Sequence, residues 1–96
     1  MKNFKLTDKT TEFISKFRVM LKELILTYIR LQVESLKDET QVFRVKTDYM
    51  RASLRNKIAT IIDMEDIELQ SEIESIAFDI YKEKINITEA IKNLNL

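Results

Sequence analysis

The stretch LKELILTYIRLQVESLK, residues 21–37, is apolar around most of the circumference that it would have as a helix. At about 100° per residue, the predicted helix at residues 8–36, which contains most of this stretch, has a main apolar stripe with Phe13, Phe17, Met20, Leu21, Leu24, Tyr28 and Leu31. A second stripe, on nearly the opposite side, carries Val19, Leu26, Ile29, Val33 and Leu36. The apolar arc spans roughly 260°, whereas an ordinary surface helix has an arc a little over 100° wide. We therefore expect this helix to be buried on two sides.

The composition favours an all-α fold. The 96 residues contain no Gly, Pro, Cys, His or Trp. Without Gly, tight hairpin turns are difficult to form, which disfavours β architecture. Hydrophobic residues at 45% and charged residues at 33% indicate a globular chain, and the length suits a single domain over residues 1–96.

Three main helices and a short C-terminal helix are predicted as a three-helix bundle with one added helix, at residues 8–36, 39–62, 66–84 and 89–94. The boundaries follow residues that cap helices, such as Asp8, Asp63 and Thr88. The helix at 39–62 also has a second, weaker apolar stripe with Val42, Val45, Tyr49 and Ala52. The stretch KDET, residues 37–40, is a weak break. If it does not interrupt the helix, the first two helices form one long rod that pairs in a coiled coil.

The bundle would leave part of the second stripe of the first helix uncovered. Monomers rarely expose a contiguous apolar patch of that size, so two-fold self-association is the economical solution. The sequence thus predicts a homodimer interface made of Val19, Leu26, Ile29, Val33 and Leu36. Another protein could also place a helix in the same apolar groove.

Charged residues are unevenly distributed although the formal net charge is zero. Residues 44–57 are mostly basic, and residues 63–79 carry only acidic charges. These segments either attract each other within one molecule or each face a partner. As an alternative function, Arg44, Arg51 and Arg55 form one stripe at helical spacing that could follow a nucleic-acid backbone.

Catalysis has little support in the sequence. Without His or Cys, the usual general base and the thiol nucleophile are missing, and without Gly no phosphate-binding loop can form. We therefore expect no enzyme, no cofactor and no metal site. The remaining enzyme alternative uses cations within apolar arcs, namely Arg18, Lys22, Lys46 and Lys57. The helical chorismate mutases are similar in size and class, but their L-R-x-x-I-D pattern is absent because no aspartate follows Arg18.

The N-terminal residues MKNFKLTDKTTEF lack the apolar core of a signal peptide, so we expect a cytoplasmic protein without a membrane partner. Frequent Ile, Lys and Asn are typical of AT-rich microbial or phage genomes. The function predicted from these features is protein–protein interaction, as a small dimeric regulator, adaptor or inhibitor.

Overall fold

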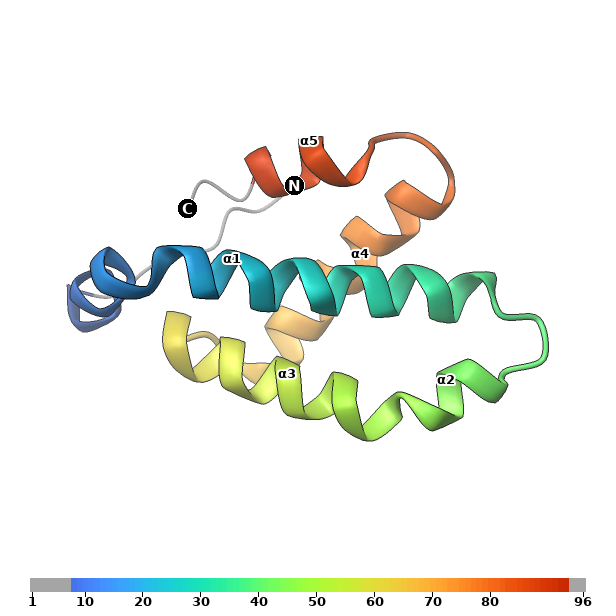
Figure 1. Ribbon diagram of the computed structural model, residues 1–96, viewed down its shortest axis with the longest axis horizontal. Helices are drawn as coiled ribbons and strands as arrows, with labels where there is room; N and C mark the ends of the chain where they lie inside the picture. Colours follow the sequence, from blue (N-terminus) through green and yellow to red (C-terminus); the bar gives the residue numbers. More distant parts are fainter. Residues whose placement is uncertain (1–7, 94–96) are drawn as a thin grey trace.

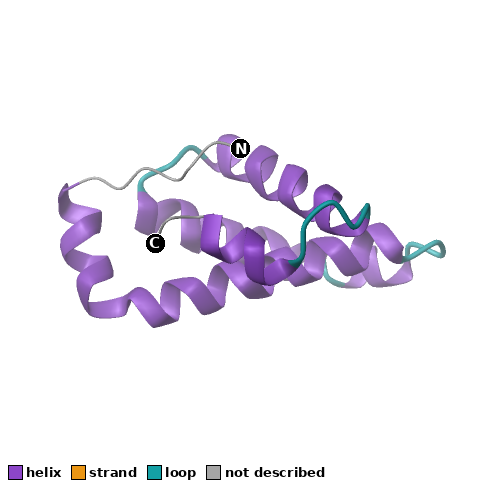
Figure 2. Cartoon of the chain, turned by 90° about the horizontal axis from the view of Figure 1, so that it is seen from above, coloured by secondary structure: helices purple, strands orange, loops and turns teal. Residues whose placement is uncertain are grey.

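The computed structural model describes the backbone of residues 8–93 and the side chains of residues 18–92. This part of the chain contains helices and no strands, so the all-α prediction is confirmed (Figure 1). The helices are α1 (Asp8–Lys37), α2 (Val42–Lys46), α3 (Asp48–Ile62), α4 (Asp66–Tyr81) and α5 (Ile87–Asn93). Short loops join them, as the view from above also shows (Figure 2).

The long helix α1 is the centre of the fold. Its most extensive contacts are with α3 and α4, and α3 and α4 contact each other less. In Figure 1, α3 runs antiparallel to α1 on one side, α4 crosses behind α1, and α5 lies on the side opposite α3. Because neighbours from the same chain lie on several sides of α1, its wide apolar arc is largely covered without a second molecule.

The KDET stretch is a true break between α1 and α2. The Asp38 carboxylate accepts hydrogen bonds from Phe43 N (2.7 Å) and from Thr40 Oγ1 (2.7 Å). These bonds hold the pKa of the Asp38 carboxyl below its ordinary value, with the Thr40 bond as the largest cause. Gln41 adopts a left-handed conformation with φ 63°. The alternative prediction, in which the first two predicted helices form one continuous rod, is therefore wrong for this chain.

The predicted helix at 39–62 is two helices, and this prediction is also corrected. Thr47 separates α2 from α3, with φ −98° and ψ 1°. Its hydroxyl donates a 2.8 Å hydrogen bond to Phe43 O, and Arg51 N donates a 2.9 Å bond to Thr47 O. Bonding of side chain to backbone at a Thr competes with the regular helix pattern, which accounts for a local kink rather than a full reversal.

The other boundaries agree with the prediction to within a few residues. Helix α4 ends at Tyr81 rather than at residue 84, because Glu83 turns the chain with φ 60°. Helix α5 begins at Ile87, two residues earlier than predicted, and Asn86 Oδ1 accepts a 2.8 Å bond from Glu89 N at its start. Residue 94, the predicted end of this helix, lies outside the described residues.

The core gathers apolar side chains from four helices. Its buried members are Leu21, Ile25, Tyr28, Ile29, Val33, Ile58, Ala59, Ile62, Leu69, Ile73, Ile76, Ala77 and Ala90. On α1, Ile25 and Ile29 are both fully buried, so the buried arc is centred between the two stripes that the sequence suggested. Phe13 and Phe17 lie outside the described side chains. Within residues 8–93, no helix has both the length and the apolar character needed to cross a membrane.

Candidate functional site

The five residues predicted as a dimer interface do not form one surface. Ile29 and Val33 are 0% and 6% exposed, so both belong to the core and that part of the prediction is wrong. Leu26 is half-buried. Val19 and Leu36 are exposed, but they are about 25 Å apart along the helix axis. The physical reason is that α3, α4 and α5 together cover the face of α1 that the sequence left open.

A different apolar surface is exposed on α2 and the first turn of α3. We call it the α2–α3 surface, and it consists of Val42, Val45, Tyr49 and Met50, which are 52%, 72%, 86% and 53% exposed. The hydrogen bonds through Thr47 keep α2 and α3 in nearly continuous helical register, which aligns Val42, Val45 and Tyr49 at three-four spacing. Helix α2 contributes no buried residue. The second stripe of the predicted 39–62 helix was the sequence signal for this surface.

The arginine stripe predicted for nucleic acid is not exposed as a stripe. Arg44 is exposed, but Arg51 is only 9% exposed and the Arg55 side chain 20%. All three line a cleft between α3 and α4 whose floor is α1, and we call it the α3–α4 cleft. An extended phosphate backbone could not run along these residues, because Arg51 and Arg55 are largely buried in the cleft and do not form an exposed stripe.

Arg51 connects three helices. Its Nη1 donates to Gln32 Oε1 on α1 (2.7 Å), its Nη2 to Arg44 O on α2 (2.7 Å), and its Nε to Thr47 Oγ1 (3.2 Å). Asp48 Oδ1 is farther away, at 3.7 Å from Nη2. Because α2 has no buried residue of its own, Arg51 is a main link between α2 and the rest of the protein.

Arg55 connects the basic segment to the acidic one. Its Nε lies 2.9 Å from Asp66 Oδ2, so the two segments attract each other within the molecule at this point. The Arg55 guanidinium also interacts with the Tyr28 phenol, which favours the ionised form of the phenol. Burial raises the pKa of the Tyr28 phenol above its ordinary value of 10.0, although the bond to Arg55 acts in the opposite direction.

The α3–α4 cleft has a volume of about 490 Å³ and a mixed lining. Polar side chains include Gln32, Arg51 and Arg55, and apolar walls come from Leu36, Ala52 and Phe78. The contacts between α3 and α4 are few, which agrees with an opening between these two helices. A cleft of this kind can hold a small molecule with a polar and an apolar end.

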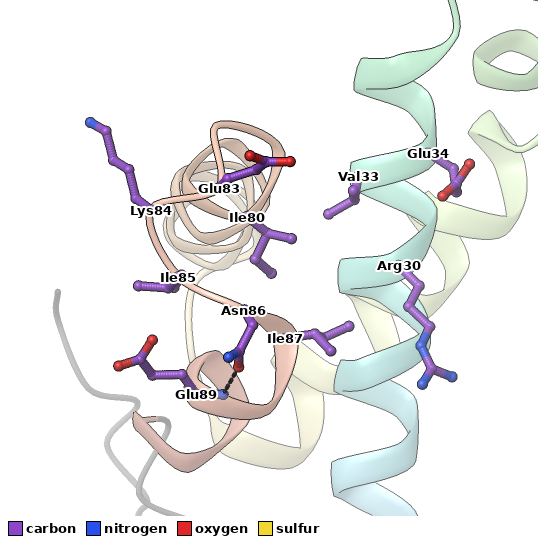
Figure 3. Close-up of a pocket in the computed structure, with 10 residues that line it drawn as sticks. All are labelled: Arg30, Val33, Glu34, Ile80, Glu83, Lys84, Ile85, Asn86, Ile87 and Glu89. Carbon is purple, nitrogen blue, oxygen red and sulfur yellow. Dashed lines mark hydrogen bonds between the residues drawn. The ribbon is translucent and has the colours of Figure 1, made fainter.

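A second cleft lies between α1, the end of α4 and the start of α5 (Figure 3). Its volume is about 680 Å³, and Val33, Ile80 and Ile87 form its apolar wall. Figure 3 shows Arg30 and Glu34 directed away from this wall. The cleft therefore has charged groups of both signs at its edge and no convergent set of one sign.

The cations of the enzyme alternative are not gathered in these clefts. A third cleft, between α1 and α3, is lined by Met20, Leu24, Asn56, Lys57, Thr60 and Ile61. Of the four cations named for that alternative, Lys57 lines this cleft, whereas Arg18, Lys22 and Lys46 line none of the three. Among the described side chains, no group of three or more Asp or Glu residues is arranged to hold a metal ion.

The chain matches no protein-family model, no curated protein and no solved structure. Inference about its function therefore depends on the geometry of its own surfaces.

Proposed function

We propose that the protein is a non-enzymatic interaction protein, a small regulator, adaptor or inhibitor that acts through its α2–α3 surface. The observation that carries the proposal is the exposure of four neighbouring apolar side chains, led by Val45 at 72% and Tyr49 at 86%. Contiguous exposed apolar surface is typical of interaction sites. Full burial of each such aliphatic side chain is worth about 1.5–3 kcal/mol. In this proposal, α1, α3 and α4 act as a three-helix bundle that supports α2.

The occupant that fits this surface best is a second copy of the chain. Two-fold dimers place the same patch of both subunits face to face. If the α2–α3 segments cross antiparallel about Val45, Val42 of one copy lies near Tyr49 of the other. Arg44 then lies near Asp48 of the second copy, and this pairing occurs twice because of the symmetry. Both side chains are exposed on the α2–α3 segment, so the charge pattern supports an antiparallel contact.

The absence of cysteine suits a reducing compartment, so we propose that this association takes place in the cytoplasm. The partner in an adaptor or inhibitor complex would use the same apolar surface and would compete with the second copy.

The mass in solution tests the proposal, measured by light scattering after gel filtration at micromolar concentration. The variant Val45→Glu places a charge in the proposed interface, and we expect it to be monomeric while the unchanged protein is dimeric. Val19→Glu is the matched control, because Val19 is 76% exposed and Val45 72% exposed and the two undergo the same change. We expect Val19→Glu to remain dimeric.

Three outcomes would reject the proposed interface. These are an unchanged protein that is monomeric, a Val45→Glu variant that stays dimeric, and a Val19→Glu variant that alone becomes monomeric. The last outcome would move the interface to α1, close to where the sequence first placed it.

A further inference from the structure

Among the described residues, the carboxylate paired with Arg51 is that of Asp48, and it lies beyond hydrogen-bond distance. The Arg51 side chain is 11% exposed, and its three hydrogen bonds of 3.2 Å or less go to neutral oxygens of Gln32, Arg44 and Thr47. The Asp48 carboxylate, at 3.7 Å, has a side chain that is 82% exposed. Removing a charge from water is costly unless an opposite charge compensates for it. The wall of the α3–α4 cleft therefore carries a positive charge that is satisfied in hydrogen bonds and only weakly neutralised, by an exposed carboxylate.

A second donor lies beside it. Gln32 is 8% exposed and uses its Oε1 atom to accept the bond from Arg51. Its Nε2 atom is the donor group of the same side chain, and Gln32 lines the cleft. Arg55, one helical turn beyond Arg51 on α3, lines the same cleft. Residues four apart on a helix are neighbours on one face, so the two guanidinium groups and the amide form a set of donors.

Arg55 is paired with Asp66 at 2.9 Å, but no carboxylate in the lining of the cleft forms a hydrogen bond of 3.5 Å or less with Arg51. Asp48 and Glu74 line the cleft, but both are exposed, and Glu74 accepts a 3.1 Å bond from Gln70. Water and salt screen exposed charges far more strongly than buried ones. Arg51 is the least exposed charged residue in the lining of the cleft.

We propose that the α3–α4 cleft binds a small organic anion. A single carboxylate or phosphate group would pair with Arg51 and Arg55 and accept a hydrogen bond from Gln32 Nε2. Guanidinium groups suit this role because they present paired donors that match the oxygens of both anions. An aromatic or aliphatic body would pack against Leu36, Ala52 and Phe78. The volume of about 490 Å³ is within the range of small-molecule sites, roughly 300–1,000 Å³.

The test is an NMR titration of the full chain with phenyl phosphate and, separately, with phenylacetate, which distinguishes the two head groups. Benzyl alcohol is the probe without charge, and inorganic phosphate is the probe without an apolar body. We expect saturable binding of at least one aromatic anion in the millimolar range or tighter. The shifts should centre on the Gln32 side-chain amide and on the backbone of Ala52 and Phe78, and each single-feature probe should bind more weakly.

Two variants locate the site. Arg51→Gln should weaken binding of the aromatic anion by about tenfold or more, since bonds to a charged group are the strong ones. Lys57→Gln removes the same charge from an exposed position on α3 that does not line this cleft, and it should bind like the unchanged protein. Ala52→Phe fills the cleft while leaving the bonds of Arg51 in place, so it decides the question if circular dichroism shows that Arg51→Gln does not fold.

The proposal is overturned if no aromatic anion binds saturably to the unchanged protein, or if its shifts lie outside the cleft. It is also overturned if Arg51→Gln and Ala52→Phe, or whichever of the two folds, bind the aromatic anion as tightly as the unchanged protein does. The same holds if Lys57→Gln weakens binding as much as Arg51→Gln does. This site does not depend on the α2–α3 surface, so a failure of the dimer proposal leaves it standing.

Discussion

Nη1 of Arg51 on α3 donates a 2.7 Å hydrogen bond to Oε1 of Gln32 on α1, and both residues are nearly buried. The pair is 19 residues apart in the sequence. Through its second bond to Arg44 O, Arg51 also holds α2. One polar pair thus supports both proposed activities: it positions the helix that carries the α2–α3 surface, and it lines the α3–α4 cleft.

Replacing Gln32 with Leu should destabilise the protein. The change removes the acceptor for Arg51 Nη1 and leaves a buried, charged donor unsatisfied, which costs about 1–3 kcal/mol. Urea denaturation followed by circular dichroism measures the loss in the free energy of unfolding. Gln70→Leu is the control, because Gln70 bonds the exposed Glu74 on its own helix. Equal stability of the two variants would show that the Arg51–Gln32 bond contributes nothing specific.

The sequence predicted the helices well where capping residues mark their ends. Asp38 and Asn86 accept hydrogen bonds at the starts of α2 and α5, and Asp66 begins α4 as predicted. Thr88, the cap predicted for the last helix, lies inside α5 instead. The kink at Thr47 was missed, because Thr is common inside helices and no Gly or Pro marks the site. Local signals thus located the ends of the helices but not a bend that depends on one hydroxyl.

Which face of α1 is buried could not be predicted from the residues of α1 alone. When apolar residues cover most of the circumference of a helix, its own sequence does not show which face is buried. The side chains that cover the buried face of α1 come from residues 58 to 90. Ile29 and Val33 were therefore assigned to a partner although their cover lies later in the same chain.

The cleft was missed for a similar reason. Arg44, Arg51 and Arg55 look alike in the sequence, and a charged residue is usually solvated. Arg51 differs from Arg44 because it is nearly buried and donates hydrogen bonds to Gln32, Thr47 and the Arg44 carbonyl, contacts that depend on the fold.

The buried face of α4 should respond far more strongly to truncation than its outer face. Ile73→Ala opens a cavity in the core and should lower the free energy of unfolding by about 2–5 kcal/mol. Ile67→Ala is the same change on the same helix, but Ile67 is 76% exposed and Ile73 is fully buried, so its effect should stay within about 0.5 kcal/mol. Chemical denaturation compares the two. A large loss for Ile67→Ala would indicate that α4 has a different buried face.

Tyr28 should make stability depend on pH in the alkaline range. Burial raises the pKa of this phenol above the 10.0 of an ordinary tyrosine. The folded state therefore favours the protonated phenol, and this contribution to stability is complete below pH 10.0 and is lost as pH rises through the higher folded pKa. Urea denaturation on either side of pH 10.0 measures the slope.

Tyr28→Phe should reduce this alkaline loss of stability, because the ionisable group is gone. Tyr49→Phe is the control. Because Tyr49 is 86% exposed, this variant should show the same dependence of stability on alkaline pH as the unchanged protein. Lysine titration affects all three proteins in the same way, so the difference between them reports Tyr28. An alkaline slope that is identical in Tyr28→Phe and the unchanged protein would contradict the role assigned to burial.

In the antiparallel dimer, reversing the charge of either Arg44 or Asp48 should weaken association, and reversing both charges should restore it. Arg44→Glu would place a carboxylate beside Asp48 of the second copy, twice by symmetry, so we expect the dissociation constant of the dimer to rise. Asp48→Arg alone should weaken the dimer in the same way by opposing two cations. The double variant Arg44→Glu, Asp48→Arg restores opposite charges across the interface, and it should dimerise better than either single variant.

Sedimentation equilibrium at two salt concentrations measures the dissociation constants of all four proteins. The coupling energy between the two substitutions should be smaller at the higher salt concentration, because both side chains are exposed. If the two single effects simply add in the double variant, Arg44 and Asp48 do not meet across the interface, and the copies associate in another orientation.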